Sequence, residues 1–184
     1  MNPRFGKHFL YSISKHAPSD LHIFTQSNSQ ASTMHKEAID NAAALIKSKK
    51  DGVLSTLSVK LDGFPFGSVV PYCLDTAGWP VILISTIAEH TKNIKADNRC
   101  SLTIVMDGED VQANGRICLI GHMTEVLSEE KEIMERYYAQ FPKSRSYDAT
   151  HDFLFYRLAP VSIRYIGGFG QIHWFEPNDF KSED

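Results

Sequence analysis

The sequence has no long apolar run and no excess of charge of one sign. No stretch approaches the ~20 consecutive apolar residues of a membrane-spanning helix. The formal net charge of the 184 residues is only −3, so the basic field of a nucleic-acid-binding protein is missing. Phe9–Ile13 is too short and too polar for the apolar part of a secretory signal. We therefore expect neither a nucleic-acid partner nor a membrane partner.

Cysteine is scarce. The three cysteines, Cys73, Cys100 and Cys118, lie in apolar segments, and no two of them form a CxxC pair. An odd number without framework spacing is typical of free thiols in a reducing compartment. The expected location is therefore cytoplasmic.

Common catalytic and metal-binding signatures are also missing. No Ser-His-Asp arrangement, GxGxxG fingerprint or P-loop occurs in the sequence. The histidines near the N-terminus, His8, His16, His22 and His35, lack the spacing of metal ligands. No metal site is expected, and the catalytic residues stay unknown at this level.

The apolar pattern predicts a domain rich in β-strands. Residues 1–30 read as an N-terminal extension and residues 31–184 as one domain, in which Ser32 or Thr33 caps a helix that runs to about Lys49. Two further helices are expected at 87–95 and 129–140, and strands at 53–57, 64–74, 81–85, 101–106, 116–126, 153–158, 163–166 and 171–175. Pro71 suggests an edge or a bulge, and Gly121 a bend. Strands joined by short turns indicate an α+β fold whose antiparallel sheet curls into a barrel.

Several segments together resemble a known family. They are Phe64–Tyr72, Leu83–Ser85, Ala88–Asn93, Asp152-Phe153, Arg157-Leu158 and Gly167–Gly170. On these residues the chain resembles the pyridoxamine 5'-phosphate oxidase-like, FMN-binding split-barrel family over roughly residues 33–180. It looks closest to the haem-utilisation (HugZ/HutZ) and CREG-like branch. The resemblance implies a split β-barrel with flanking helices that acts as a homodimer, with a small-molecule ligand at the dimer interface.

The same resemblance implies a site for FMN. In flavin-binding members the phosphate lies where the second and third strands meet the short helix, and hydroxyls, amides and a helix N-terminus suit such an anion. The matching residues are Ser68 and Val69, then Ser85 and Thr86, and on the helix His90, Thr91 and Asn93. The leading interpretation is an FMN-binding flavoprotein, an oxidoreductase in which the flavin carries the redox chemistry.

The chain departs from the oxidase at this phosphate site. The oxidase has an Arg and a Lys on the second strand and an Arg-Lys pair at the helix, whereas this chain has Gly67 or Ser68, Tyr72 and the pair His90-Thr91. Each lost charge-assisted hydrogen bond is worth ~1.5–3 kcal/mol. Genuine pyridoxamine-phosphate oxidase activity is therefore not expected.

Two alternative functions stay open. One is a haem-binding or haem-degrading protein of the haem-utilisation type. By resemblance, Arg116 and Asp152 match positions implicated there, and His173 is the nearby histidine. Without the resemblance, Arg116 and Asp152 would equally suit a structural ion pair. The other alternative is a cofactor-free, CREG-like dimeric interaction module, which the missing phosphate cations favour.

Overall fold

The computed structural model describes residues 20–150, 152–168 and 170–181. They form two units, one that ends at His35 and one that begins at Lys36. The long helix α1 (Asp20–Ser48) begins before Ser32, the earlier of the two predicted caps, because no proline or glycine interrupts residues 20–48. Of the predicted extension, residues 1–19 lie outside the described residues.

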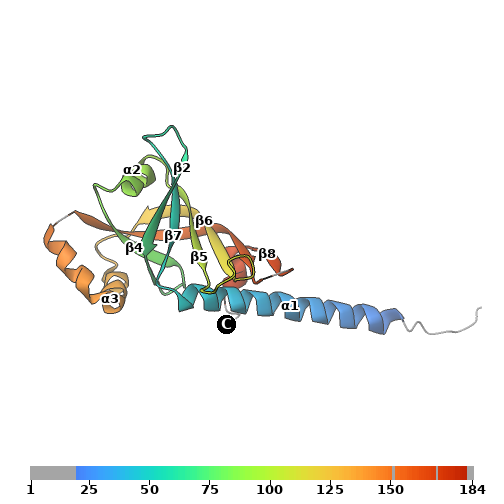
Figure 1. Cartoon of the computed structure of the whole chain (residues 1–184). Helices are drawn as coiled ribbons and strands as arrows, with labels where there is room; N and C mark the ends of the chain where they lie inside the picture. Colours follow the sequence, from blue (N-terminus) through green and yellow to red (C-terminus); the bar gives the residue numbers. More distant parts are fainter. Residues whose placement is uncertain (1–19, 151, 169, 182–184) are drawn as a thin grey trace, which may run out of the picture. The chain divides into compact units, whose positions relative to one another are not determined.

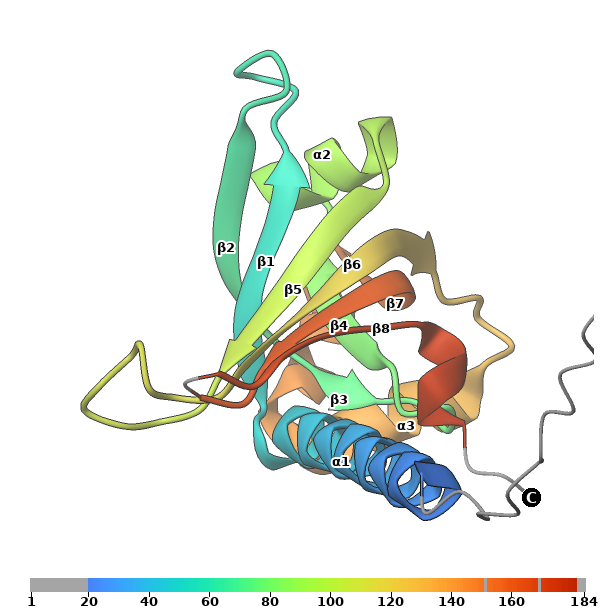
Figure 2. The ribbon, with the colours of Figure 1, turned by 90° about the vertical axis from the view of Figure 1, so that its right-hand side faces the viewer.

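In the described part of the chain, the second unit contains one antiparallel sheet of eight strands. The strands are β1 (Asp51–Leu57), β2 (Pro65–Pro71), β3 (Cys73–Leu74), β4 (Pro80–Ser85), β5 (Arg99–Val105), β6 (Arg116–Glu125), β7 (Phe153–Ile166) and β8 (Ile172–Phe175). Their order is β2-β1-β5-β6-β7-β4-β3, and β8 pairs with β7. Figures 1 and 2 show this sheet curling, with β2, β1, β5, β6, β7 and β8 side by side.

Helices flank the sheet at several places. Helix α2 (Glu89–Ala96) follows β4, and helix α3 (Lys131–Gln140) follows β6. Two short 3-10 helices, η1 (Pro142–Thr150) and η2 (Pro177–Phe180), complete the described elements. The predicted α+β class and antiparallel split barrel are thereby confirmed.

Strand β7 corrects one prediction. The sequence predicts separate strands at 153–158 and 163–166, but β7 is a single 14-residue strand. Pro160 cannot donate a ladder hydrogen bond, yet it lies where the register between β6 and β7 shifts after Ile120, and such an irregular position tolerates proline. On β6, a Cβ at Gly121 would lie 2.1 Å from the carbonyl oxygen of Ala159. Gly121, predicted as a bend, is therefore the residue that lets the two strands approach.

Strand β2 and its continuation also differ from the prediction. The expected strand at 64–74 is divided at Tyr72 into β2 and β3. The Tyr72 hydroxyl is buried and donates a 2.6 Å hydrogen bond to the carbonyl oxygen of Ile46, which ties this break to the end of α1. Strand β2 stands at one end of the strand order, the edge position that Pro71 suggested.

The core lies on the inner face of the sheet. Every second residue of β5 is buried, and the same alternation runs along β6 as far as Met123. Apolar residues of α1 join the same core, namely Ala38, Ala42, Leu45 and Ile46. A second cluster between β4, β7 and α3 contains Ile133, Tyr137 and Phe155. None of the helices in the described ranges is both long and apolar enough to cross a membrane.

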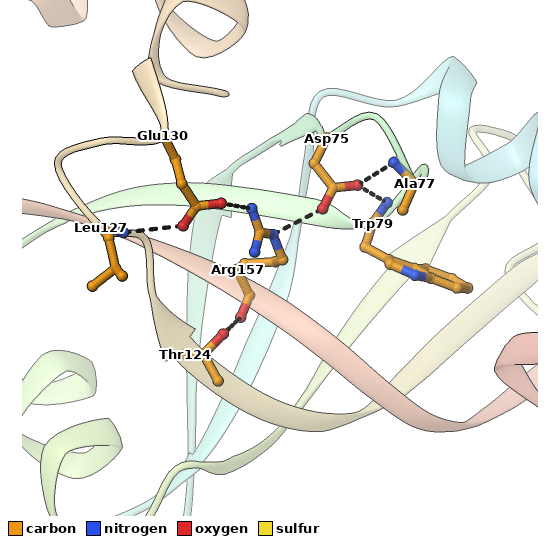
Figure 3. A network of polar contacts seen from close by, with 7 residues as sticks. All are labelled: Asp75, Ala77, Trp79, Thr124, Leu127, Glu130 and Arg157. Carbon is orange, nitrogen blue, oxygen red and sulfur yellow. Dashed lines mark hydrogen bonds and ion pairs between the residues drawn. The ribbon is translucent and has the colours of Figure 1, made fainter. Parts of the chain in front are cut away.

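A polar network joins the turn after β3 to β7 and to the segment before α3 (Figure 3). The Asp75 side chain, only 5% exposed, lies 2.8 Å from Arg157 Nε, and its other oxygen accepts 2.9 Å hydrogen bonds from the backbone N–H groups of Ala77 and Trp79. Arg157 also donates to Glu130 at 2.6 Å. Since Arg157 Nε makes no aligned hydrogen bond, its contact with Asp75 is one of charge.

Candidate functional site

Several residues matched to a flavin phosphate gather at the start of α2. His90 Nδ1 lies 3.2 Å from Ser68 Oγ on β2. Ser85 ends β4, and its hydroxyl accepts a 3.4 Å hydrogen bond from the backbone N–H of Ile87. The next residue, Thr86, donates its backbone N–H to the carbonyl oxygen of Asp152 at 2.5 Å. This α2 corner, made of Ser68, Ser85, Thr86 and His90, is a half-buried polar surface.

Thr91 and Asn93 are occupied by structural hydrogen bonds. Both side chains are almost fully buried. Thr91 Oγ1 donates to the Ser85 carbonyl oxygen at 2.6 Å. The Asn93 amide accepts from the Val59 backbone N–H at 2.9 Å and donates to Thr56 Oγ1 at 3.0 Å. These contacts fasten α2 to β4 and β1, and they leave the two polar side chains unavailable to a ligand.

Val69 lies away from the α2 corner. It is 71% exposed and faces the opposite side of β2 from its neighbour Ser68, because successive strand residues alternate in direction. The structure therefore brings together four of the seven residues matched to the flavin site and separates Val69 from them.

The electrostatics of the α2 corner do not suit a phosphate. Burial lowers the pKa of His90, so its imidazole is neutral at pH 7. Lys92 forms a 2.7 Å ion pair with Glu89 and lowers the pKa of that carboxyl, which is therefore ionised. A dianion at this corner would meet a neutral imidazole and a carboxylate, so the residues present do not fit the FMN phosphate.

The three residues considered for haem lie apart. Arg116 begins β6 opposite Ile166, the last residue of β7, whereas Asp152 precedes the first residue of β7. These two residues stand at opposite ends of β7, and the ion pair considered between them does not form. The His173 ring lies parallel to the Phe175 ring, with centroids 5.5 Å apart, and Phe175 belongs to the core.

Arg116 instead contacts the loop between β5 and β6. Its Nη1 lies 3.3–3.5 Å from the backbone carbonyl oxygens of Val111, Gln112 and Asn114. Figure 2 shows this loop projecting beyond the end of the sheet. These are long, neutral contacts, so the charge of the guanidinium is not compensated by them.

The outer face of the sheet carries exposed apolar side chains. One row crosses six strands in register: Val69, Val53, Thr103, Cys118, Arg164 and Trp174. Val69 is 71% exposed and Trp174 is 59% exposed, and Ile172 beside Trp174 is 54% exposed. Exposed apolar side chains gathered on one face are typical of an interaction or ligand site.

A hollow of about 390 Å³ lies on this outer face. It is bounded by Leu57 of β1, Pro65 of β2, Arg99 of β5, and Cys118 and Ile120 of β6. Its volume is within the ~300–1,000 Å³ of small-molecule sites. Sequence reasoning missed this hollow, because its residues come from four strands and only the strand register brings them together.

Two arginines stand beside the hollow. Arg164 is the cross-strand partner of Cys118, and its guanidinium lies 4.9 Å from the Trp174 ring centroid. Arg116 precedes Cys118 by two residues and faces the same side of β6. Across the described residues, no carboxylate forms an ion pair with either arginine. The outer face therefore combines an apolar hollow with two uncompensated cations.

This fold defines a split β-barrel of the pyridoxamine 5'-phosphate oxidase-like class. Residues 33–182 match the family "CREG, beta-barrel", and the chain belongs to this family. The predicted resemblance to the CREG-like and haem-utilisation branch is thereby confirmed.

Relatives of this chain include proteins named for haem. The chain is 40% identical over 120 residues to "Non-canonical heme oxygenase HOZ, chloroplastic" of Arabidopsis thaliana, a match that covers 64% of this chain and 36% of that protein. A heme binding protein from Mycobacterium smegmatis has a TM-score of 0.71 at 27% identity, over 78% of this chain and 59% of that chain.

The flavin side of the class shares the fold. A pyridoxinephosphate oxidase family protein from Clostridium acetobutylicum, related to general stress protein 26, has a TM-score of 0.60 at 13% identity, over 79% of this chain and 99% of that chain. At this identity the likeness concerns the fold alone.

Proposed function

We propose that this protein binds haem in the hollow on the outer face of the sheet, at the interface of a homodimer. The observation that carries the proposal is the apolar hollow beside Arg116 and Arg164, neither of which is ion-paired within the described chain. The names of the Arabidopsis and Mycobacterium relatives support the same ligand.

The chemistry of the hollow fits a porphyrin. Haem is a flat apolar ring with two carboxylates on one edge. Leu57, Pro65 and Ile120 supply apolar surface, which contributes about 25 cal/mol per Å² buried. Arg116 and Arg164 supply the cations that carboxylates prefer, through charge-assisted hydrogen bonds.

The homodimer completes this site. A hollow on an open sheet face covers one side of a flat ligand, so a second surface is needed to exclude water from the other side. The exposed apolar side chains of this face, Val53, Val69, Ile172 and Trp174, provide a surface for a second copy of the chain. A stable interface of this kind buries at least about 1,000 Å².

A haemin titration followed by visible absorption tests the proposal. We expect a defined Soret band that saturates at one haem per subunit and elutes with a dimer in gel filtration. The double variant Arg116→Ala, Arg164→Ala is expected to bind at least ~10-fold more weakly, since each lost charge-assisted bond is worth ~1.5–3 kcal/mol. A titration without a defined band, or with a monomeric mass at micromolar concentration, would contradict the proposal.

The same loaded protein distinguishes a haem carrier from a haem-degrading enzyme. When bound, haem supplies the iron and its redox chemistry, while the residues of this chain hold and orient the ring. With ascorbate in air, loss of the Soret band together with released iron supports degradation. A stable band supports a carrier.

The flavin interpretation stays a prediction and is the second candidate. The hydroxyls of Ser68 and Ser85 at the α2 corner favour it, while the lack of a free cation among the described residues of that corner counts against it. FMN that stays with the protein through gel filtration would support a flavoprotein oxidoreductase. Binding of neither haem nor FMN would leave the cofactor-free dimeric module as the best account.

A cytoplasmic location is part of the same proposal. The described structure records Cys73, Cys100 and Cys118 as free thiols, which suits a reducing compartment. A fluorescent fusion in the native host tests this location, and import into an organelle would overturn it.

A further inference from the structure

His122 lies beside two residues that line the outer-face hollow, Arg99 and Ile120. It belongs to β6, where Gly121 and Met123 face the core and His122 therefore faces outward. Its cross-strand partner on β5 is Arg99. Ile120 precedes it on the same face of β6, and both Arg99 and Ile120 line the hollow.

The His122 ring is held in one tautomer by Asn98. His122 Nδ1 lies 3.0 Å from Asn98 Oδ1. An amide oxygen can only accept a hydrogen bond, so Nδ1 carries the proton and Nε2 keeps its lone pair. The backbone oxygen of Asn98 accepts a 2.8 Å hydrogen bond from the Met123 N–H, which fixes Asn98 beside the ring. An outer hydrogen bond of this kind is what metal-ligating histidines usually have.

The surroundings favour iron in a macrocycle over a bare metal ion. The described residues contain no group of three or more His, Cys, Asp and Glu that could hold a metal ion. A bare ion needs several protein ligands, whereas a porphyrin would supply most of the ligands itself and would need few from the protein. Arg99 beside the ring is bound by both oxygens of Asp97 and would bring no net charge to the iron.

The other described histidines of the barrel unit are placed differently. His90 contacts Ser68 at the α2 corner. The His173 ring is stacked on Phe175 and Tyr165, both of which belong to the core. His122 is thus the described barrel histidine that combines the outer face, two neighbours that line the hollow and a ring nitrogen left without a partner.

We propose that His122 would coordinate the iron of a bound haem through Nε2, and that Asn98 is the positioning residue that sets its tautomer. This inference rests on the proposed haem-binding function. It names the residue that would hold the iron, while Arg116 and Arg164 would pair with the carboxylates of the ring.

Spectroscopy of the haem-loaded full chain tests the proposal. We expect His122→Ala to lose the spectrum of histidine-ligated iron in absorption, electron paramagnetic resonance and the iron–histidine band of resonance Raman. In His122→Gly, added imidazole is expected to restore that spectrum. Asn98→Ala is expected to shift the iron–histidine band and weaken haem binding by about 10-fold, whereas Asn98→Asp, which keeps an acceptor, is expected to retain binding and to shift the band in the opposite direction, because a carboxylate makes the imidazole more basic. His35→Gln is the matched control, because His35 belongs to the other unit.

The outcomes separate this inference from the proposed function. If the wild-type protein binds no haem, the proposed function fails. If it binds haem and His122→Ala retains a histidine-ligated spectrum, the function stands and His122 is not the ligand. Loss of that spectrum in His173→Gln, with His122→Ala unaffected, would likewise overturn the inference. Circular dichroism is used to confirm that each variant is folded before its haem spectrum is compared with that of the wild type.

Discussion

Replacing Arg157 by methionine tests the polar network of Figure 3. The substitution keeps the apolar stem and leaves the Asp75 carboxylate, 5% exposed, without its cation. Breaking one side of a fully buried ion pair costs ~3–5 kcal/mol. Asp75 keeps two backbone hydrogen bonds and Arg157 is 27% exposed, which reduces the cost. We therefore expect Arg157→Met to lower the free energy of unfolding by about 2 kcal/mol.

Urea denaturation of a double-mutant cycle measures this effect. Asp75→Asn removes the carboxylate but keeps an oxygen for the N–H groups of Ala77 and Trp79. The double variant Arg157→Met, Asp75→Asn should therefore be more stable than Arg157→Met alone, with an interaction energy above about 1 kcal/mol. Additivity of the two changes within about 0.5 kcal/mol would refute the coupling.

The free energy of unfolding, measured as a function of pH in the acid range, gives an independent check on the same network. Hydrogen bonding from Arg157 lowers the pKa of Glu130 in the folded protein. A lowered carboxyl pKa stabilises the fold above its unfolded value of ~4.3, and this contribution is lost as the pH falls through the folded value. The stability gap between wild type and Arg157→Met should therefore narrow below about pH 4. A gap that is constant with pH would argue against the Glu130 contact.

Four further predictions concern the barrel. Gly121→Ala places a methyl group against backbone and should destabilise the fold by at least about 2 kcal/mol, measured by thermal unfolding with a silent surface variant as control. Asn93→Ala leaves buried polar groups unpaired and should cost about 2–3 kcal/mol of stability, whereas ligand affinity of the folded fraction stays constant in titration. Trp174→Glu should convert the proposed dimer to a monomer in analytical ultracentrifugation, and an unchanged dimer would exclude this face. Burial raises the pKa of Cys73 to about 11 and of Cys100 to about 12, so both should resist alkylation at pH 8 until the protein unfolds, as mass spectrometry of labelled peptides would show.

Local sequence patterns predicted most elements of the barrel, because strands with one buried face alternate between apolar and more polar residues. The alternation along 116–126 and the turn at Asp75–Gly78 are recovered as β6 and the connection from β3 to β4. The continuity of β7 was missed because proline argues against a strand from sequence alone. Only the pairing partner shows that Pro160 meets the irregular position opposite Gly121.

The candidate site was predictable only where it is contiguous in sequence. The family motif led to the α2 corner, and Ser68 and His90 do meet there. The motif could not show that the Asn93 side chain is hydrogen-bonded to Thr56 and to the Val59 N–H, because these partners are more than 30 residues away in the sequence. His122 carried no motif, and its significance depends on Asn98, which is 24 positions away.

The two candidate ligands require different physical surfaces, and this difference argues for the outer face. A flavin phosphate concentrates charge on one group and needs permanent cations or several free donors there. The α2 corner offers a neutral His90 and a Lys92 that already pairs with Glu89. A porphyrin is held mainly by contact with apolar side chains, and its carboxylates lie at one edge. The centre of its binding site therefore needs no cation. A hollow flanked by Arg116 and Arg164 meets that requirement, because the strand register separates the apolar contacts from the charged ones along one face.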